Sequence, residues 1–270
     1  YVRITAYAED LYQGLERLDQ WSDAAVNAQK YWIGRKEGLD ISFQINDLND
    51  KSISAFTTRP EFLYGAQALL VAPENEDIDE LISDDKLQLI KKYRQSALVK
   101  SDVERQSSKE KTAIDTGLTA VHPLTQEIIP IFMSENVVAS HGVTAEIMTP
   151  AHNGRDLELS KQIELEAVNV VKGSDVLPDT ATEGLLDKSG RYSNLSFEEA
   201  AEEITQDLIA LGSAKRSIRY KLKDWAIGRQ RFWGAPIPML ETKTGEFIPE
   251  AEERLPVRLP DSTEIDTFGA

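Results

Sequence analysis

The spacing of apolar residues predicts a helix at the start of the chain and strands after it. Within residues 1–28, apolar side chains recur at three- and four-residue intervals, as on one face of an amphipathic helix. The aromatic residues at 31–33 stand just before Gly34, which predicts a short strand that ends in a bend. Residues 39–45 then alternate between apolar and polar, the pattern of a strand with one buried face. The members of the first stripe are Ala6, Leu11, Leu15 and Leu18.

Short apolar segments continue to about residue 176 and predict a sheet with a few helices. We expect strands at residues 68–72, 128–132 and 136–139, and helices at 77–94 and 156–163. In the first of these helices, the side chains expected to face inward are Leu81, Ile82, Leu87, Leu89 and Ile90. The polar segment 101–111 is expected to be a mobile loop. Together these elements predict a mixed α+β fold, a β-barrel-like domain decorated by helices.

Residues 196–211 carry a clear helix signal. Ser196 can cap the first turn, Glu199 stands three positions later as in a capping box, and Gly212 can end the helix. The preceding segment, 187–194, is polar and rich in turn formers. After the helix comes a basic cluster, which consists of Lys215, Arg216, Arg219, Lys221, Lys223, Arg229 and Arg231. This cluster is either the exposed face of a helix or a local patch for a nucleic acid.

Composition narrows the class of protein. The 270 residues are 41% hydrophobic, which fits one large or two smaller globular domains. The chain has no cysteine, which excludes disulfides and thiolate metal sites, and its three histidines are too scattered for a metal-spacing argument. No apolar run approaches the length of a membrane span. The net charge of −16 argues against a general nucleic-acid binder, because phosphates are bound by basic surfaces.

The candidate chemistry starts with residues 56–65. Two hydroxyls, Thr57 and Thr58, precede Arg59 and Pro60, and a helix-compatible run follows. By local physics alone this is a capped helix start with a surface arginine, since hydroxyls cap helices and proline suits the first helical position. Two further stretches follow at 115–125 and 149–156; they are Asp-Thr-Gly-Leu-Thr-Ala-Val-His-Pro-Leu-Thr and Thr-Pro-Ala-His-Asn-Gly-Arg-Asp.

In this order, the three stretches resemble the editing domain of leucyl-tRNA synthetases, the connective-peptide insertion that hydrolyses wrongly charged tRNA. The resemblance covers nearly the whole chain and implies a core edge at 1–32, the editing domain at 33–222 and a return into the catalytic core at 223–270. The family's ATP-gripping signatures, His-Ile-Gly-His-like and Lys-Met-Ser-Lys-Ser-like, are absent. ATP and Mg²⁺ would therefore belong to the missing core, the chain would not aminoacylate, and editing would need no cofactor. Tyr1 at the start also suggests a fragment of a longer chain.

The reaction that the resemblance implies is hydrolysis of the ester in misacylated tRNA(Leu), with isoleucyl, norvalyl or methionyl groups as substrates. A leucine-selecting site cannot reject near-isosteres well, since one methylene changes binding by about 1–3 kcal/mol. A second pocket needs orientation, an anchor for the α-ammonium and donors for the oxyanion, but no protein nucleophile. The implied partners are the tRNA(Leu) 3′ end with its non-cognate amino acid and the rest of the synthetase chain, in a monomer without membrane attachment.

The resemblance also assigns roles to residues of the first and third stretches. Asp156 would anchor the ammonium, with a helix cap as the structural alternative. Arg59 would contact a phosphate or support the site, unless it forms a surface ion pair, and His152 would line the pocket rather than catalyse. The catalytic set is Thr57, Thr58 and Asp156, and the substrate-binding set is Arg59, Phe62, Thr149, His152, Asn153 and Arg155. No residue is assigned to a metal.

Three positions depart from the family pattern and imply weakened editing. Phe62 stands where the family usually has threonine, Thr149 where it has a small apolar residue, and Asn153 where it has aspartate. A phenylalanine at position 62 would occupy volume meant for a non-cognate side chain, unless its ring turns outward into the core and Thr149 instead makes the pocket more polar. The alternatives are a decayed domain kept for RNA binding or architecture and an isoleucine- or valine-type editing domain, although residues 115–125 favour the leucine type. The divergence and a tail without zinc ligands point to the mitochondrial matrix, with the bacterial cytoplasm as the alternative.

Overall fold

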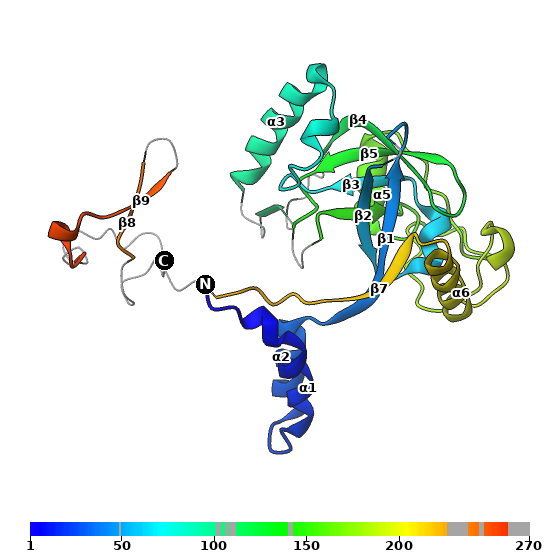
Figure 1. Cartoon of the computed structure of the whole chain (residues 1–270). Coiled ribbons are helices and arrows are strands. Elements are labelled where there is room, and N and C mark those ends of the chain that lie inside the picture. Colours follow the sequence, from blue (N-terminus) through cyan, green and yellow to red (C-terminus); the bar gives the residue numbers. More distant parts are fainter. Residues whose placement is uncertain are drawn as a thin grey trace. The chain divides into compact units, whose positions relative to one another are not determined.

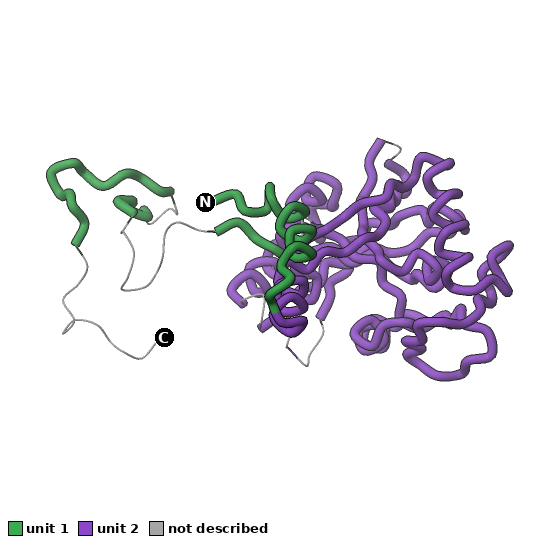
Figure 2. Tube along the Cα trace, turned by 90° about the horizontal axis from the view of Figure 1, so that it is seen from below, with its two compact units in different colours: residues 1–21, 222–270 green, residues 22–221 purple. Residues whose placement is uncertain are grey.

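The computed structural model describes residues 1–48, 50–100, 104–105, 108, 112–139, 143–225, 237–242 and 246–258. The chain divides into two compact units (Figure 2). The smaller unit combines Tyr1–Trp21 with Leu222–Ala270, and the larger unit is the continuous segment Ser22–Lys221. The domain boundaries expected after residues 32 and 222 stay predictions. No helix among the described residues is long and apolar enough to cross a membrane.

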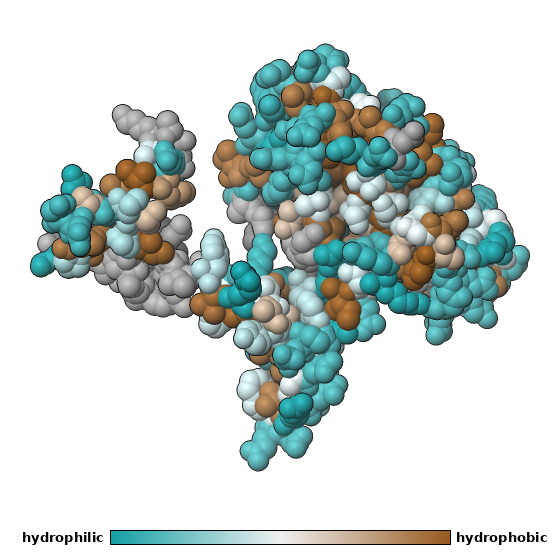
Figure 3. Space-filling view, viewed as in Figure 1, coloured by the Kyte–Doolittle hydropathy of each residue, from teal (hydrophilic) through white to brown (hydrophobic). Residues whose placement is uncertain are grey.

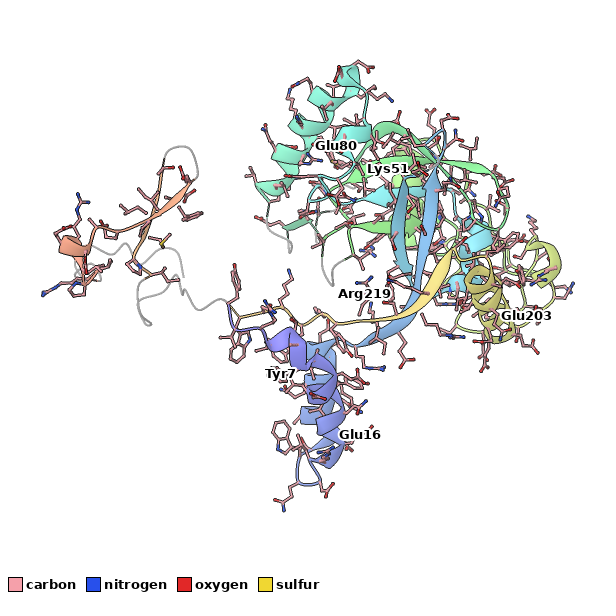
Figure 4. All side chains as sticks on the ribbon, viewed as in Figure 1. Tyr7, Glu16, Lys51, Glu80, Glu203 and Arg219 are labelled. Atoms are coloured by element: carbon pink, nitrogen blue, oxygen red, sulfur yellow. The ribbon has the colours of Figure 1, made fainter. Side chains whose placement is uncertain are left out.

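The N-terminal part of the smaller unit consists of short helices, whereas the sequence predicted one long helix. These helices are η1 (Ile4–Tyr7), α1 (Ala8–Gly14) and η2 (Leu15–Arg17). The C-terminal part of this unit contains β8 (Met239–Glu241), β9 (Phe247–Pro249) and η6 (Glu252–Arg254). The Asp224 carboxylate accepts hydrogen bonds from the backbone N–H and the hydroxyl of Thr5, at 3.0 and 2.7 Å. Tyr7 and Glu16, both labelled in Figure 4, are exposed on these elements. The expected stripe is therefore incomplete, and Leu11 is 43% exposed.

The larger unit begins with α2 (Asp23–Ile33), which corrects the strand predicted at 31–33. The Ser22 hydroxyl accepts a hydrogen bond from the Ala25 backbone N–H at 3.3 Å and caps this helix. Gly34 ends it in a left-handed conformation, with φ of 62°. The aromatic residues before Gly34 therefore form the last turn of a helix, because the cap and the terminal glycine outweigh the strand preference of aromatic side chains.

β1 is the longest described strand and joins its neighbours into one sheet (Figure 1). It pairs with β7 and β2 along most of its length and with β4 at its end. The order along the sheet is β2-β1-β4-β5-β3-β6, with β7 also beside β1, and β3 runs parallel to β5. The strands are β1 (Lys36–Ile45), β2 (Ser52–Thr57), β3 (Ala68–Val71), β4 (Ala113–Val121), β5 (Ile128–Ser134), β6 (Ala145–Met148) and β7 (Ala214–Arg219).

The sheet approaches a barrel without closing. β2 and β6, at the two ends of the strand order, pack against each other. Within the described part of the chain, however, no backbone ladder joins these two strands. The mixed fold predicted from the sequence is confirmed, with helices on a seven-stranded sheet that is not a closed barrel.

Alternation along β1 places its apolar side chains in the main core. Leu39, Ile41, Phe43 and Ile45 are each no more than 2% exposed, and burying a side chain of this size stabilises the fold by about 1.5–3 kcal/mol. The same core receives the buried face of α6 (Phe197–Ala210). A smaller apolar cluster lies between β3, β6 and α5 (Gly154–Gln162), and it seats α5 on the sheet.

Four local predictions fail or concern residues that the structure does not describe. Leu89 is 60% exposed, because α3 (Asp84–Leu98) buries Ile90, Arg94 and Ala97 on its other face. Residues 136–139 are not a strand; the Ser134 carbonyl accepts the Val137 backbone N–H at 3.2 Å and closes a turn instead. The helix expected at 77–94 is split between η4 (Asp79–Leu81) and α3. The expected mobile loop at 101–111 lies largely outside the described residues.

α6 confirms its predicted start and end. The Ser196 hydroxyl accepts the Glu199 backbone N–H at 3.3 Å, and the Glu199 carboxylate accepts the Ser196 backbone N–H at 3.0 Å. Gly212 follows the helix with φ of 71°. The basic residues after it are not the face of a helix, because positions 214–219 form strand β7. Arg229 and Arg231 lie outside the described residues.

Candidate functional site

The turn between β2 and η3 (Pro60–Gly65) carries the first predicted stretch. The Thr57 hydroxyl accepts a hydrogen bond from the Arg59 backbone N–H at 3.0 Å, which shapes the turn at the end of β2. Pro60 takes the first helical position, as predicted. The element that follows is a short 3-10 helix, and it buries Phe62 at 4% exposure. Local sequence therefore places two hydroxyls and a guanidinium at the end of a sheet strand.

His122, from the second stretch, holds η3 in place. Its Nδ1 accepts the backbone N–H groups of Leu124 and Thr125, at 3.2 and 3.1 Å. The ring proton therefore sits on Nε2, which donates to the Leu63 carbonyl at 2.9 Å. Burial lowers the pKa of His122 and keeps the ring neutral. The role of this stretch is to fix the backbone that bears the site.

Phe62 lies in a stack of three side chains. Its ring is parallel to the His152 ring, with centroids 4.1 Å apart and an interplanar angle of 9°. The Arg59 guanidinium lies 4.4 Å from the centroid of the same ring. Phe197 of α6 meets the ring edge-on at 5.2 Å. The ring is thus enclosed by protein and borders the site from the core side.

Arg59 is an ion-paired residue rather than a free surface arginine. Its Nε donates to the Glu61 carboxylate, and Glu61 is 5% exposed. Its guanidinium also donates to the Ala181 carbonyl at 3.0 Å. Arg59 therefore does form an ion pair, but its partner is a buried carboxylate rather than one at the surface. These contacts set the position of a cation at the edge of the site.

His152 is held by the backbone on both of its nitrogens. Nδ1 lies 3.2 Å from the Asp179 carbonyl, and Nε2 accepts the Val170 backbone N–H at 3.3 Å. Because Nε2 accepts, the proton is on Nδ1 and the ring is neutral. Burial lowers the pKa of His152. The His152 ring packs on the Phe62 ring, and its two hydrogen bonds connect the loop of the third stretch to residues 170 and 179.

The start of α5 separates the roles of two neighbouring residues. Asn153 is the cap, because its side-chain oxygen accepts the Arg155 backbone N–H at 3.0 Å. Asp156 is not the cap; its Oδ2 accepts the Thr149 backbone N–H at 2.9 Å. Burial, and then the charge of Glu146, raise the pKa of Asp156 to about 6. A buried carboxylate with few partners is a strong candidate to bind a cation.

One pocket of about 420 Å³ brings the predicted residues together. From the predicted site, the pocket is lined by Thr57, Thr58, Arg59, Phe62, Thr149, His152, Asn153 and Arg155. Asp156 does not line it, but it is joined to the lining through Thr149. Polar side chains from β2, η3 and the start of α5 thus meet in one place, although these segments lie far apart in the sequence.

The sequence analysis missed two charged residues of this pocket, Lys36 and Glu146, and named a third, Arg219, only as a member of the basic cluster. Lys36 and Arg219 are directly paired residues on β1 and β7, and Figure 4 labels Arg219 at the end of β7. Arg219 donates to both oxygens of Asp40 at 2.8 Å. A detectable signal existed for Glu146, a charged residue inside the apolar strand β6. Among the described residues, no group of three or more histidine, aspartate or glutamate side chains could hold a metal ion.

The comparison with known families decides what this pocket belongs to. Residues 30–209 match the family described as "Leucyl-tRNA synthetase, editing domain". The chain belongs to the leucyl-tRNA synthetase editing-domain family. This confirms the resemblance seen in the three stretches, and the editing-domain match contains every residue of the predicted site.

Relatives of the editing domain show how much of a longer protein the chain represents. It is 37% identical over 273 residues to leucine--tRNA ligases of Clostridium perfringens strains SM101 and 13, and it spans 33% of their length. A solved structure described as a ternary complex of Agrobacterium radiobacter agnB2 LeuRS, tRNA and LeuAMS is 34% identical, with a TM-score of 0.68. That match covers 97% of this chain and 30% of the other.

Proposed function

We propose that this chain is the editing module of a leucyl-tRNA synthetase and hydrolyses the ester bond of misacylated tRNA(Leu). The observation that carries the proposal is the single pocket shared by eight of the nine predicted residues, with the carboxylate of the ninth bonded to its wall. Family membership alone supports an editing domain; the pocket supports a hydrolytic one. Isoleucyl, norvalyl and methionyl groups are the proposed acyl groups, and the 3′ end of tRNA(Leu) is the proposed partner.

The proposed chemistry uses water as the nucleophile. Asp156 holds the α-ammonium of the amino acid, since a buried carboxylate attracts a cation strongly. The hydroxyls of Thr57 and Thr58 donate toward the ester and the terminal ribose, where negative charge develops as water adds to the carbonyl carbon. The ester C–O bond then breaks, the free amino acid leaves, and the ribose hydroxyl is regenerated. No cofactor takes part, and the ATP- and Mg²⁺-dependent step is assigned to the rest of the synthetase.

Cations at the pocket support binding of the tRNA end. Lys36, Arg59, Arg155 and Arg219 all line it. Arg59 and Arg219 already pair with carboxylates, whereas Lys36 and Arg155 have no ion pair among the described residues. We therefore assign Lys36 and Arg155 to the terminal phosphates. A net charge of −16 leaves such local cations as the means of attracting RNA.

The departures at positions 62, 149 and 153 support weakened editing as the finer proposal. Phe62 is part of the pocket wall and fills space there. Thr149 adds a hydroxyl to the wall, and Asn153 supplies an amide where the family has a carboxylate. The specific observation that favours the alternative, a domain retained for RNA binding or architecture, is the enclosure of Phe62 where the family has a smaller threonine. We propose a monomer in the mitochondrial matrix, with the bacterial cytoplasm as the second choice.

The test is deacylation of isoleucyl- and norvalyl-tRNA(Leu) by this chain and by its full-length parent. Asp156→Asn should slow hydrolysis by about tenfold to a hundredfold, the loss expected for one charge-assisted contact of about 1.5–3 kcal/mol. Glu158→Gln, an exposed carboxylate on the same helix, is the matched control and should change nothing. Unchanged hydrolysis in the Asp156 variant would remove that residue from the site, and a parent that leaves both substrates intact would favour the non-hydrolytic alternative.

A further inference from the structure

Glu146 is a charged residue at a position built for an apolar one. It lies in the middle of β6, opposite Leu70 of β3. Ala145 and Met148, at the two ends of this strand, are fully buried, whereas Glu146 itself is half-buried. Leu70 and Met148 belong to the apolar cluster under α5. A half-buried carboxylate loses part of its hydration, and a cation or hydrogen-bond donors offset that loss. The position therefore favours a partner for the carboxylate.

The described residues do not supply that partner by direct contact. No described side chain or backbone group forms a hydrogen bond or close ion pair with the Glu146 carboxylate, and only the longer-range charges of Arg155 and Lys36 act on it. Burial, opposed by these two cations, raises the pKa of Glu146. Its side chain lines the pocket beside Thr149 and Arg155. A carboxylate that has no hydrogen-bond or ion-pair partner among the described residues thus lines the space proposed for the substrate.

Thr149 connects Glu146, which lines the pocket, with Asp156, which does not. The Thr149 backbone N–H binds Asp156 Oδ2, while Thr149 itself lines the pocket together with Glu146. The two carboxylates are close enough for the charge of Glu146 to raise the pKa of Asp156. Like charges in a buried site repel each other, and a shared cation relieves that repulsion.

An ammonium group suits two carboxylates better than one. It carries three N–H donors, and Asp156 already spends one oxygen on Thr149. A second carboxylate can take a donor that Asp156 leaves unused. The other cations of the pocket do not fill this role by contact, since Arg59 pairs with Glu61 and Arg219 with Asp40.

We propose that Glu146 is a second carboxylate of the ammonium site, which together with Asp156 binds the α-ammonium of the aminoacyl group. This rests on the proposed function, because it places the aminoacyl group in the same pocket. It makes Glu146 a specificity-determining residue for a free α-ammonium, so that acyl groups without that cation are disfavoured.

Two non-hydrolysable ligands separate this role from a structural one. One is adenosine that carries norvaline in amide linkage at its 3′ position; the other is the same compound with the α-ammonium replaced by a hydroxyl. Binding is measured by calorimetry at about pH 7, where an acid with a pKa of about 6 is mostly ionised and an α-amino group is still mostly protonated. The proteins are the unmodified chain, Glu146→Gln, Asp156→Asn and the control Glu158→Gln, each checked by thermal unfolding.

We expect Glu146→Gln to weaken binding of the ammonium ligand about tenfold or more, the effect of losing one charge-assisted contact, and to leave the hydroxyl ligand unchanged. Equal weakening of both ligands, or no change in either while Asp156→Asn loses the ammonium preference, would overturn the role of Glu146 and leave the proposed function standing. An unmodified chain that binds neither ligand would overturn both proposals.

Discussion

The Phe62 ring has a protein neighbour on each face and a third at its edge. Arg59 and His152 cover the two faces, and Phe197 meets the edge. The sequence left two positions open for this ring, a plug in the amino-acid pocket or an outward position in the core. In the structure the ring is 4% exposed and packs in the core, and its remaining surface forms part of the pocket wall. Its effect on substrate is therefore exerted through the shape of that wall.

Replacing Phe62 by threonine should have two opposite effects. The loss of the stack and of most of the ring volume should lower the free energy of unfolding by about 3 kcal/mol, because large-to-small core changes leave a cavity. The room gained should raise deacylation of isoleucyl-tRNA(Leu) per folded molecule. Urea unfolding and deacylation rates measure the two effects, with Phe62→Leu as a control that keeps the wall apolar. Rapid deacylation at the same rate by the unmodified chain and by the Phe62→Thr variant would show that the ring does not limit the pocket.

Asp156 should make folding depend on pH. Its pKa rises from 3.8 to about 6 on folding, mainly through burial, so between these values the folded chain holds a proton that the unfolded chain releases. Stability should therefore fall as pH rises from about 4 through about 6, by at most about 3 kcal/mol, and then level off. Asp156→Asn keeps an oxygen for the Thr149 N–H and should remove this fall. Urea titrations across that range provide the check, and identical pH profiles would contradict it.

Paired strands, rather than single residues, bring charge to the pocket. β1 and β7 lie side by side from Lys36 and Arg219 inward, so both residues reach the pocket from the same end of the ladder. Asp40 of β1 is 4% exposed and receives Arg219 at 2.8 Å on both oxygens. The ion pair orients the Arg219 guanidinium at the pocket edge and compensates the charge of the buried Asp40 carboxylate.

Asp40→Asn should lower the free energy of unfolding by about 2 kcal/mol, because it removes a charge-assisted contact from a buried position. The matched control is Glu202→Gln, which removes the exposed pair of Glu202 with Arg216 and should cost much less, because solvent screens exposed ion pairs. Denaturant unfolding of both variants makes the comparison. Equal losses would show that burial of the Asp40 pair contributes nothing extra.

Elements with strong local sequence patterns could be predicted from the sequence. The faces that they bury and the elements that they contact could not. The β1 alternation and the Ser196 capping box were confirmed, because both are local patterns. The segment before Gly34 was mistaken for a strand, because its helix is decided by a cap at Ser22, eleven residues earlier than Ile33. Glu146 was missed because β6 has only four residues, too few to show an alternation.

The candidate site followed the same division. The family resemblance supplied the nine residues from the first and third stretches, and the structure placed eight of the nine in one pocket. The contributions of Lys36 and Arg219 depended on a pairing between strands about two thirds of the chain apart, which no local pattern encodes. Asp156 could not be distinguished from a cap until Asn153 was seen to fill that position.

At the scale of the whole molecule, negative charge dominates and hydrophilic residues cover most of α3 and α6 on the face shown in Figure 3. Binding of tRNA should therefore be weak and local. If only the four cations of the pocket meet phosphates, the slope of log affinity against log salt should be no steeper than about −3, at about −0.7 for each single-strand contact. Fluorescence titrations of a tRNA(Leu) acceptor end at several salt concentrations measure it. A much steeper slope would reveal a wider basic surface.

The pairing of β1 with β7 also bears on whether the segment between them can be removed as a whole. The Lys221 backbone N–H donates to the Ile33 carbonyl at 3.0 Å, so the segment between these two residues begins and ends at adjacent backbones. Neighbouring strands are about 4.8 Å apart. Deletion of residues 34–220 therefore leaves two backbone ends separated by about the width of one strand, and a short turn is enough to join them. We expect that this segment can be removed from the chain, or inserted again, without moving the elements on either side of it.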